Sequence, residues 1–205
     1  MKVSLVHTKG GVGKTTTCIF LAAAAARDGR HTRVIDADPQ GSASSWADRA
    51  AASDTPLPFD VVPMTDPAAL RALTSTPGEL VFIDTPPGTA ATIDAAIDTA
   101  DLVIITSGAR PADIDRVFPT LDITAHRATT VLLTQVDQRT VEADEVPKAL
   151  ANLDVPVPLM RTVVRDRTAI MRSFGRSVPR YLADYGDVYD ELIAELKELG
   201  LEEKP

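Results

Sequence analysis

Cysteine is almost absent from this chain. Among its 205 residues only Cys18 is a cysteine. One thiol cannot form a disulfide within the chain, and it cannot supply the several thiolates of a zinc or iron–sulfur centre. The sequence therefore excludes a disulfide-stabilised scaffold and a cysteine-ligated cofactor, and it is typical of a protein from a reducing cytoplasmic interior.

Long apolar segments are missing as well. The longest run with little charge extends from Thr15 to Ala26. It is shorter than the roughly 20 residues that span a bilayer, and it follows a glycine-rich loop instead of the basic segment of a signal peptide. We therefore expect no signal peptide, no membrane contact and a cytoplasmic location.

Positive charge is in deficit overall but is concentrated in one segment. The chain has 21 Lys and Arg against 29 Asp and Glu, a net charge of −8, which argues against a protein that coats nucleic acid over its whole surface. Between Arg161 and Arg180, however, six arginines and one aspartate give a local charge of +5, which leaves about −13 for the rest of the chain. This local reversal of sign requires an explanation.

Short apolar runs alternate with helical patterns along the whole chain. Several runs, such as Leu-Val-Ile-Ile at 102–105, show no polar alternation, which is typical of strands buried on both faces of a parallel sheet. The predicted strands are 3–7, 32–36, 59–63, 80–84, 102–106, 130–134 and 155–159. The predicted helices are 14–28, 43–52, 66–75, 88–99, 111–126, 141–151, 166–174 and 187–200. We predict a single α/β domain over 1–205, a mostly parallel, twisted sheet with helices on both faces.

A glycine-rich loop lies between the first predicted strand and the first predicted helix. It reads Thr-Lys-Gly-Gly-Val-Gly-Lys-Thr-Thr from Thr8 to Thr16. Backbone N–H groups in such a loop, together with the positive end of the helix dipole, bind phosphate. Lys14 is then expected to hold the β- and γ-phosphates, and the Thr15 hydroxyl to bind Mg²⁺. The sequence thus predicts a P-loop NTPase that takes ATP and Mg²⁺. The predicted nucleotide-binding residues of the loop are Lys9, Gly10, Gly11, Val12, Gly13, Lys14, Thr15 and Thr16.

The loop departs from the common P-loop pattern at its start, where Thr8 replaces glycine and a second lysine, Lys9, follows. In this it resembles the deviant Walker A family, which includes ParA, MinD, the nitrogenase iron protein and the arsenite-pump ATPase. The resemblance implies that Lys9 reaches across the interface of an ATP-bound homodimer to the partner's nucleotide. A cation delivered in this way stabilises developing charge only after the dimer has closed. A merely solvated Lys9 is the alternative.

Two predicted strands end in aspartate. Asp36-Ala-Asp-Pro-Gln-Gly41 resembles a segment of ParA-like proteins, which implies that Asp38 positions or activates the attacking water and that Asp36 supports the metal. Leu80-Val-Phe-Ile-Asp84 is similar to a Walker B strand, in which Asp84 would bind Mg²⁺ through water. An Asx turn at Asp38 and an ordinary strand end at Asp84 are the structural alternatives. The candidate metal residues are Thr15, Asp36, Asp38 and Asp84, and the candidate catalytic residues are Lys9, Lys14 and Asp38.

A third stretch, residues 131–140, resembles the ParA segment whose turn contacts the base, which places Thr134 or Gln135 there. The arginine-rich segment is where a ParA-type protein would bind DNA without sequence preference. We expect Arg165, Arg167, Arg172 and Arg176 to contact DNA, while Arg161 is more suited to the nucleotide. Pairing of these arginines with the acidic remainder of the chain is the alternative.

The resemblance implies a ParA-type switch: an ATP-bound dimer on nucleoid DNA that segregates a plasmid, chromosome or other cargo and hydrolyses ATP slowly, stimulated by a ParB-like or other adaptor. Because the chain begins at its first strand, we expect no N-terminal helix-turn-helix. Two alternatives stay open: a MinD-like positioning ATPase and a soluble ATP-dependent metabolic enzyme. An acidic last helix argues against lipid binding. The three tyrosines of the tail (181, 185 and 189) could suggest a tyrosine kinase, but their spacing is ordinary helix packing.

Overall fold

The structure is a computed structural model that describes residues 1–88, 91–153 and 157–201. Its centre is a six-stranded sheet in the order β3-β2-β4-β1-β5-β6, and every strand pair is parallel. The strands are β1 Lys2–Val6, β2 Thr32–Asp36, β3 Asp60–Pro63, β4 Leu80–Asp84, β5 Leu102–Ser107 and β6 Thr129–Leu133. The predicted fold class is confirmed. If the acidic strand at 80–84 lies beside the first strand, right-handed crossovers predict the spatial order 59–63, 32–36, 80–84, 3–7, 102–106, 130–134 and 155–159. The structure confirms this order for the first six strands.

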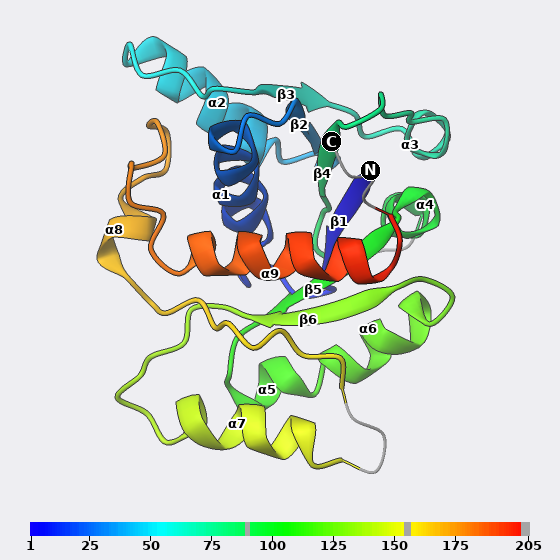
Figure 1. The fold of residues 1–205 in the computed structure, drawn as a ribbon, viewed down its shortest axis with the longest axis vertical. Coiled ribbons are helices and arrows are strands. Elements are labelled where there is room, and N and C mark those ends of the chain that lie inside the picture. Colours follow the sequence, from blue (N-terminus) through cyan, green and yellow to red (C-terminus); the bar gives the residue numbers. More distant parts are fainter. Residues whose placement is uncertain (89–90, 154–156, 202–205) are drawn as a thin grey trace.

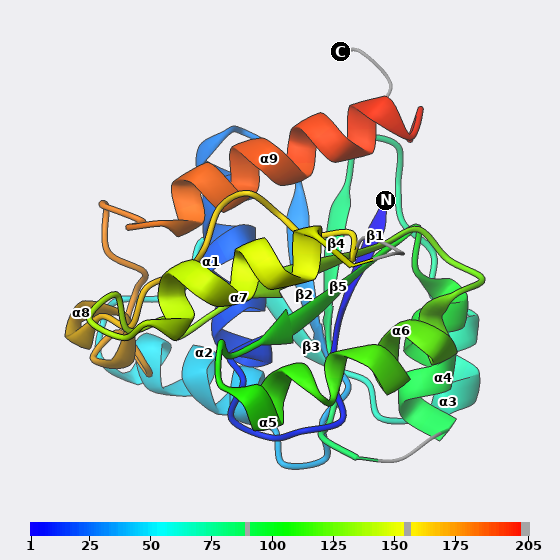
Figure 2. The same ribbon diagram turned by 90° about the horizontal axis from the view of Figure 1, so that it is seen from below.

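Helices cover both faces of this sheet (Figures 1 and 2). On one face α1, α2 and α9 pack on a large apolar core that includes Phe20, Trp46 and Tyr185. On the other face, α3, α4 and α6 pack on two further apolar clusters, and α7 contributes Leu150. The helices are α1 Lys14–Arg27, α2 Ser42–Ala52, α3 Pro67–Arg71, α4 Ala91–Thr99, α5 Pro111–Ile114, α6 Val117–Thr124, α7 Glu142–Ala151, α8 Thr168–Met171 and α9 Tyr185–Glu198. In the part of the chain described here, no helix is both long enough and apolar enough to cross a membrane.

The predicted seventh strand does not form in the residues described. Residues 155 and 156 lie outside them, and 157–159 make only an isolated parallel bridge, between Leu159 and Val131. Pro158 has no N–H to donate to a ladder. The carboxylate of Glu191 on α9 accepts the backbone N–H groups of Arg161 and Thr162, at 2.6 and 3.0 Å. A side chain, not a neighbouring strand, therefore satisfies these two backbone groups.

Three predicted helices differ in extent from those of the structure. The helix expected over 111–126 is divided into α5 and α6, with the break at residues 115–116. Pro119 lacks the N–H that would bond to the carbonyl of residue 115, so the continuous ladder is lost there. The helix expected over 66–75 ends at Arg71, and α8 occupies only the middle of the segment expected over 166–174. The start of the helix expected at 88–99 includes residues 89 and 90, outside the described chain.

Parallel pairing brings the functional motifs to one end of the sheet. Asp36 is in register with Asp84, and Asp84 with Leu5, so the two acidic strand ends flank the end of β1. The glycine-rich loop leaves β1 at that same end. Carboxyl ends of parallel strands are the usual place for a ligand in an open α/β sheet.

Candidate functional site

The phosphate loop connects β1 to the first turn of α1. Gly11 and Gly13 have φ angles of +77° and +83°, the left-handed region that favours glycine. No side chain in the described chain caps the N-terminus of α1, and its first turn has no acid, so its N–H groups are open to an anion. The Lys14 ammonium is buried and donates to the carbonyl oxygens of His7 and Lys9, at 3.3 and 3.2 Å. Burial lowers the pKa of Lys14, while the nearby Asp84 and Asp38 act in the opposite direction.

A cavity of about 390 Å³ opens above this loop. It joins the predicted phosphate-binding residues to the acidic segment after β2 and to an aromatic wall from α2 and residue 174. Its lining is Gly10, Gly11, Gly13, Lys14, Thr15, Thr16, Asp38, Gln40, Ser42, Trp46, Thr85, Pro87, Gln135 and Phe174. The aromatic pair of Trp46 and Phe174, whose ring centroids lie 5.2 Å apart, was not predicted from the sequence.

Asp84 is a fully buried carboxylate at the end of β4. It has no exposed surface, and neither of its oxygens has a hydrogen-bond partner among the residues described. Burial raises its pKa to about 7, against the smaller opposing effects of Thr15 and Lys14. Such a group fits a divalent cation, because Mg²⁺ supplies the missing positive charge and is bound through one or two carboxylates, waters and phosphate oxygens. We propose that Asp84 and the Thr15 hydroxyl would hold Mg²⁺ here, which would screen the charge of the phosphates.

Asp36 and Asp38 lie in different surroundings. Asp36 is buried, and its Oδ2 accepts from both the backbone N–H and the hydroxyl of Ser44, each at 2.7 Å. These bonds fix the start of α2. Asp38 is half-buried on the rim of the larger cavity, where its Oδ1 accepts the Gln40 N–H at 2.9 Å. We propose that Asp38 contacts a water beside the phosphate of a bound nucleotide and that Asp36 supports the metal. Ser44 was missed because a serine inside a helix carries no distinct sequence signal.

Because burial raises the pKa of Asp84, we expect the stability of the fold to depend on pH. The pKa of Asp84 is about 7 in the folded state and 3.8 for an ordinary aspartate, so the folded state binds more protons between these values. Stability therefore falls as pH rises from about 4 to 7. We expect Asp84→Asn, without nucleotide, to remove this slope and to raise the free energy of unfolding at pH 8 by about 1–3 kcal/mol. Urea unfolding at pH 5, 6, 7 and 8 measures it. An equal slope in wild type and variant would contradict the assignment.

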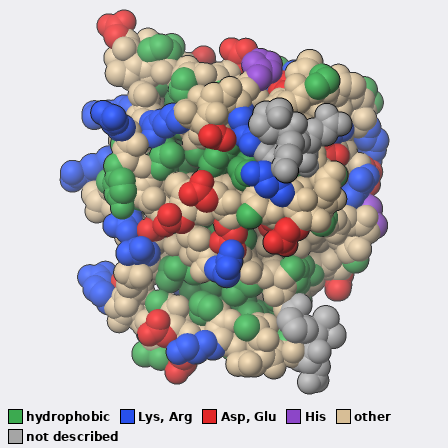
Figure 3. Space-filling view, viewed as in Figure 1, with side chains coloured by type: hydrophobic (Ala, Val, Ile, Leu, Met, Phe, Trp, Pro, Cys, Tyr) green, Lys and Arg blue, Asp and Glu red, His purple; other side chains and the backbone are tan. Residues whose placement is uncertain are grey.

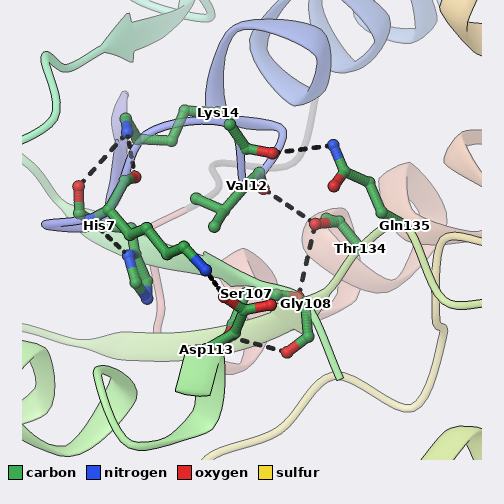
Figure 4. A network of polar contacts seen from close by, with 10 residues as sticks. His7, Val12, Lys14, Ser107, Gly108, Asp113, Thr134 and Gln135 are labelled. Atoms are coloured by element: carbon green, nitrogen blue, oxygen red, sulfur yellow. Dashed lines mark hydrogen bonds and ion pairs between the residues drawn. The ribbon is translucent and has the colours of Figure 1, made fainter. Parts of the chain in front are cut away.

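Lys9 does not point into the cavity in this structure. Its ammonium pairs with the carboxylate of Asp113, a mostly buried residue of α5 (Figure 4). Gly108 makes this approach possible, because a Cβ there would lie 2.5 Å from Asp113 Oδ2. His7 fixes the backbone of the turn, since its Nδ1 accepts the Lys9 N–H at 2.8 Å. Burial lowers the pKa of His7 to about 4, which keeps this acceptor neutral. Lys9 is thus held within its own chain, through Asp113 and His7, two residues that sequence reasoning missed.

Thr134 and Gln135 close the other side of the loop. The Thr134 hydroxyl donates to the carbonyl of Val12 at 2.9 Å, and Gln135 Nε2 donates to the carbonyl of Gly11 at 3.0 Å (Figure 4). Both residues line a second, smaller cavity of about 70 Å³, which shares Gly13, Thr16 and Gln135 with the larger one. The rest of its lining is Thr134, Val164, Arg165, Asp166, Arg167, Ile170, Met171 and Tyr185. These cavities together could hold a nucleotide, with phosphates in the larger and the base toward the smaller.

The arginines of residues 161–180 lie in three different settings. Arg161 is exposed, with Nε 3.6 Å from Glu191, and it lines neither of these cavities. Arg165 and Arg167 both pair with Asp184, each at 3.1 Å, beside the smaller cavity. Arg172 and Arg176 are exposed and, within residues 1–88, 91–153 and 157–201, form no ion pair.

The segment that carries Arg172 and Arg176 is fastened to α1 and α2. The Arg27 guanidinium, at the end of α1, donates to the carbonyls of residues 178, 179 and 180 at 2.9–3.0 Å. Trp46 Nε1 donates to the carbonyl of Arg176 at 2.8 Å. Figure 3 shows Lys and Arg side chains gathered along the edge where Figure 1 places α8. The result is a firmly held cationic rim next to the nucleotide cavities.

The chain is similar to proteins of known family. Residues 3–179 match the CobQ/CobB/MinD/ParA nucleotide binding domain. The chain is 37% identical over 207 residues to "Maintenance of carboxysome distribution protein A" of Gloeobacter kilaueensis, with 93% of each chain covered. A 44-residue segment is 54% identical to the chromosome-partitioning ATPase Soj of Thermus thermophilus, which covers 22% of this chain and 18% of that protein.

Solved structures agree on the fold. The ATP complex of Cyanothece McdA aligns with a TM-score of 0.74 at 16% identity and covers 100% of this chain and 98% of that one. MinD of Pyrococcus horikoshii OT3, complexed with Mg-ADP, aligns with a TM-score of 0.71 at 18% identity and covers 98% and 97%. With the family match over most of its length, the chain belongs to the CobQ/CobB/MinD/ParA family of nucleotide-binding proteins.

Proposed function

We propose that this chain is an ATP-driven positioning switch. Two copies close around ATP and Mg²⁺, the closed dimer binds DNA without sequence preference, and an adaptor protein stimulates hydrolysis and release. The observation that carries the proposal is the pair of lysines on one loop. Lys14 is buried at the start of α1, whereas Lys9 is half-exposed and held away from the cavity by Asp113. This difference supports a division of roles in which Lys14 binds the chain's own phosphates and Lys9 serves a second site.

The chain is an ATPase of the ParA/MinD type, and its own residues divide the work. Lys14 and the open N–H groups at the start of α1 bind the phosphates, and Asp38 orients a water on the rim of the cavity. Lys9 leaves Asp113 when the dimer forms and neutralises charge on the partner's phosphates. Hydrolysis is slow in the single chain because this last cation is absent until closure.

The similar proteins support a proposal about the cargo of this chain and its location in the cell. The match along 93% of the chain is to a protein named for carboxysome distribution, whereas the chromosome-partitioning Soj matches only 22% of it. We therefore propose that the cargo is a protein assembly distributed over the cytoplasmic nucleoid and that the adaptor belongs to that assembly. Plasmid or chromosome segregation is the second candidate.

Membrane attachment of a MinD-like kind has less support. The apolar stripe of α9 is directed inward: Val188, Leu192 and Leu196 are fully buried against the core of α1. Because the stripe already packs within the chain, its residues are unavailable to a lipid surface without unfolding the helix.

The nucleotide switch can be tested with Asp38→Ala. Because the change removes the group that orients water and leaves Lys14 in place, we expect ATP binding to persist and hydrolysis to slow at least about 10²-fold. The ATP-loaded variant should then accumulate as a dimer. Light scattering with saturating ATP and Mg²⁺, beside an ADP control, measures its mass.

A monomer under these conditions would contradict the sandwich dimer. A soluble metabolic enzyme is the other outcome: cobyrinic acid a,c-diamide synthase of Mycobacterium smegmatis shares the fold, with a TM-score of 0.69 at 18% identity and 96% of this chain and 95% of that one covered. An enzyme of that class would hydrolyse ATP rapidly with a small substrate, and DNA together with a partner protein would not raise its rate.

A further inference from the structure

The carboxylate of Asp184 connects α9 to the wall of the smaller cavity. It lies directly before α9, and its side chain is 4% exposed. Oδ2 accepts the backbone N–H of Arg165 at 2.9 Å and Nε of Arg167 at 3.2 Å. Oδ1 lies 3.1 Å from a terminal nitrogen of each arginine. Four contacts therefore converge on one buried carboxylate, and the two arginines lower its pKa against the effect of burial.

The neighbouring residue extends this connection to the phosphate loop. The Tyr185 hydroxyl lies 3.1 Å from the Thr17 hydroxyl, which is in the first turn of α1, and Tyr185 also lines the smaller cavity. The start of α9 thus contacts both the helix that follows the phosphate loop and the segment of Arg165 and Arg167. The cavity lies between these two contacts.

We infer that Asp184 is a positioning residue for the nucleotide base. It does not line the cavity, but it fixes the two arginine positions that do. Paired and ordered guanidinium groups present their N–H donors in a set direction, whereas unpaired arginines sample many rotamers and lose entropy on binding. The inference rests on the proposed function, in which the base lies in the smaller cavity. It also assigns Arg165 and Arg167 to the nucleotide instead of to DNA.

Glu191 offers a matched control on the same helix. It lies seven residues after Asp184 and also accepts two backbone N–H groups, those of Arg161 and Thr162. Glu191 faces a different groove, which no residue of the phosphate loop lines. Removing either carboxylate loosens the link between α9 and the segment before α8, but only Asp184 acts on the base cavity.

The test compares Asp184→Ala, Asp184→Asn and Glu191→Ala with the wild type, each without DNA. Trp46 is the only tryptophan of the chain and lines the larger cavity, so its fluorescence during titration with MgATP or MgGTP reports binding. For Asp184→Ala we expect the Kd for MgATP to rise about tenfold, the equivalent of one charge-assisted hydrogen bond. The preference for MgATP over MgGTP should narrow, and kcat at saturating ATP should stay within about twofold. Asp184→Asn keeps an acceptor for the Arg165 N–H, so its Kd for MgATP should lie between those of the wild type and Asp184→Ala. Glu191→Ala should have the wild-type Kd for MgATP.

A folded Asp184→Ala with the wild-type Kd would overturn the inference, and so would a Glu191→Ala that weakens MgATP equally. If Asp184→Ala does not fold, Asp184→Asn decides between the same outcomes. Failure of the proposed function looks different, because the wild type itself would then show no change of Trp46 fluorescence with MgATP and no binding in equilibrium dialysis.

Discussion

Lys9→Ala should bind ATP almost normally and hydrolyse it about 10³-fold more slowly than the wild type, the effect of a missing cation delivered in trans. Binding should persist because Lys14 and the backbone N–H groups at the start of α1 are unchanged. Hydrolysis should fall because the Lys9 ammonium would neutralise charge only in the closed dimer. Single-turnover hydrolysis of labelled ATP, with binding measured separately, provides both quantities.

Two further variants test whether the loss of hydrolysis is specific to the role of Lys9. Lys14→Ala should lose binding and hydrolysis together, since the buried ammonium at the phosphates is gone. Asp113→Asn should leave Lys9 without its carboxylate partner and shift the ATP-bound chain toward dimer at lower protein concentration. The proposed role of Lys9 is wrong if Lys9→Ala weakens ATP binding as strongly as Lys14→Ala, or if its single-turnover rate equals that of the wild type.

Arg172→Ala combined with Arg176→Ala should remove most DNA binding by the ATP-loaded dimer. Both side chains are exposed, Arg172 directly after α8 and Arg176 four residues further along, and dimer closure would bring in a second copy of the pair. Four lost phosphate contacts lower the slope of log affinity against log salt by roughly three to four. ATP binding should be unaffected, because neither arginine lines a nucleotide cavity.

The measurement is fluorescence anisotropy with random duplexes at several salt concentrations, in an Asp38→Ala background that holds ATP. Arg71→Ala is the control, since Arg71 is an exposed arginine that pairs with Asp98 at 3.3 Å, outside this rim. An unchanged salt slope in the double variant would remove Arg172 and Arg176 from the DNA surface. If the ATP-loaded Asp38→Ala dimer with Arg172 and Arg176 intact does not bind DNA even at low salt, the proposed DNA role itself is wrong.

Much of the fold could be predicted from the sequence because its signals are local. Strands such as 80–84 and 102–107 begin with continuous apolar runs, at 80–83 and 102–105, and the glycine loop between β1 and α1 has its own pattern. The order of the six strands then followed from the position of the acidic strand ends and the handedness of crossovers. The prediction of a strand over 155–159 was wrong for the residues described. It rested on the valines of this segment and took no account of Pro158 or of the Glu191 carboxylate, which lies 30 residues after Arg161.

The candidate site was predictable only in part. The phosphate loop, Asp38 and Asp84 carry motifs, and the structure brings them to one end of the sheet. Asp113, Ser44 and Asp184 carry none, since each acts through a partner distant in sequence: Lys9 lies 104 residues from Asp113, and Arg165 lies 19 from Asp184. Charge counting alone grouped all the arginines of 161–180 together. Which of them form ion pairs within the described chain depends on where α9 packs, and no local pattern specifies that.

Helix α1 connects the phosphate loop, at its first residue, to the arginine-rich segment, at its last. Its first residue, Lys14, belongs to the phosphate loop, and its last, Arg27, holds the carbonyls of residues 178–180. At 1.5 Å per residue its 14 residues form a stiff rod about 21 Å long. A shift of the loop on ATP binding would therefore be transmitted to the arginine rim. Thermodynamic linkage makes such an effect mutual: if ATP tightens the hold on DNA, DNA must tighten the hold on ATP by the same factor. A nucleoid would then act as an effector that raises the fraction of chains holding ATP at a given ATP concentration.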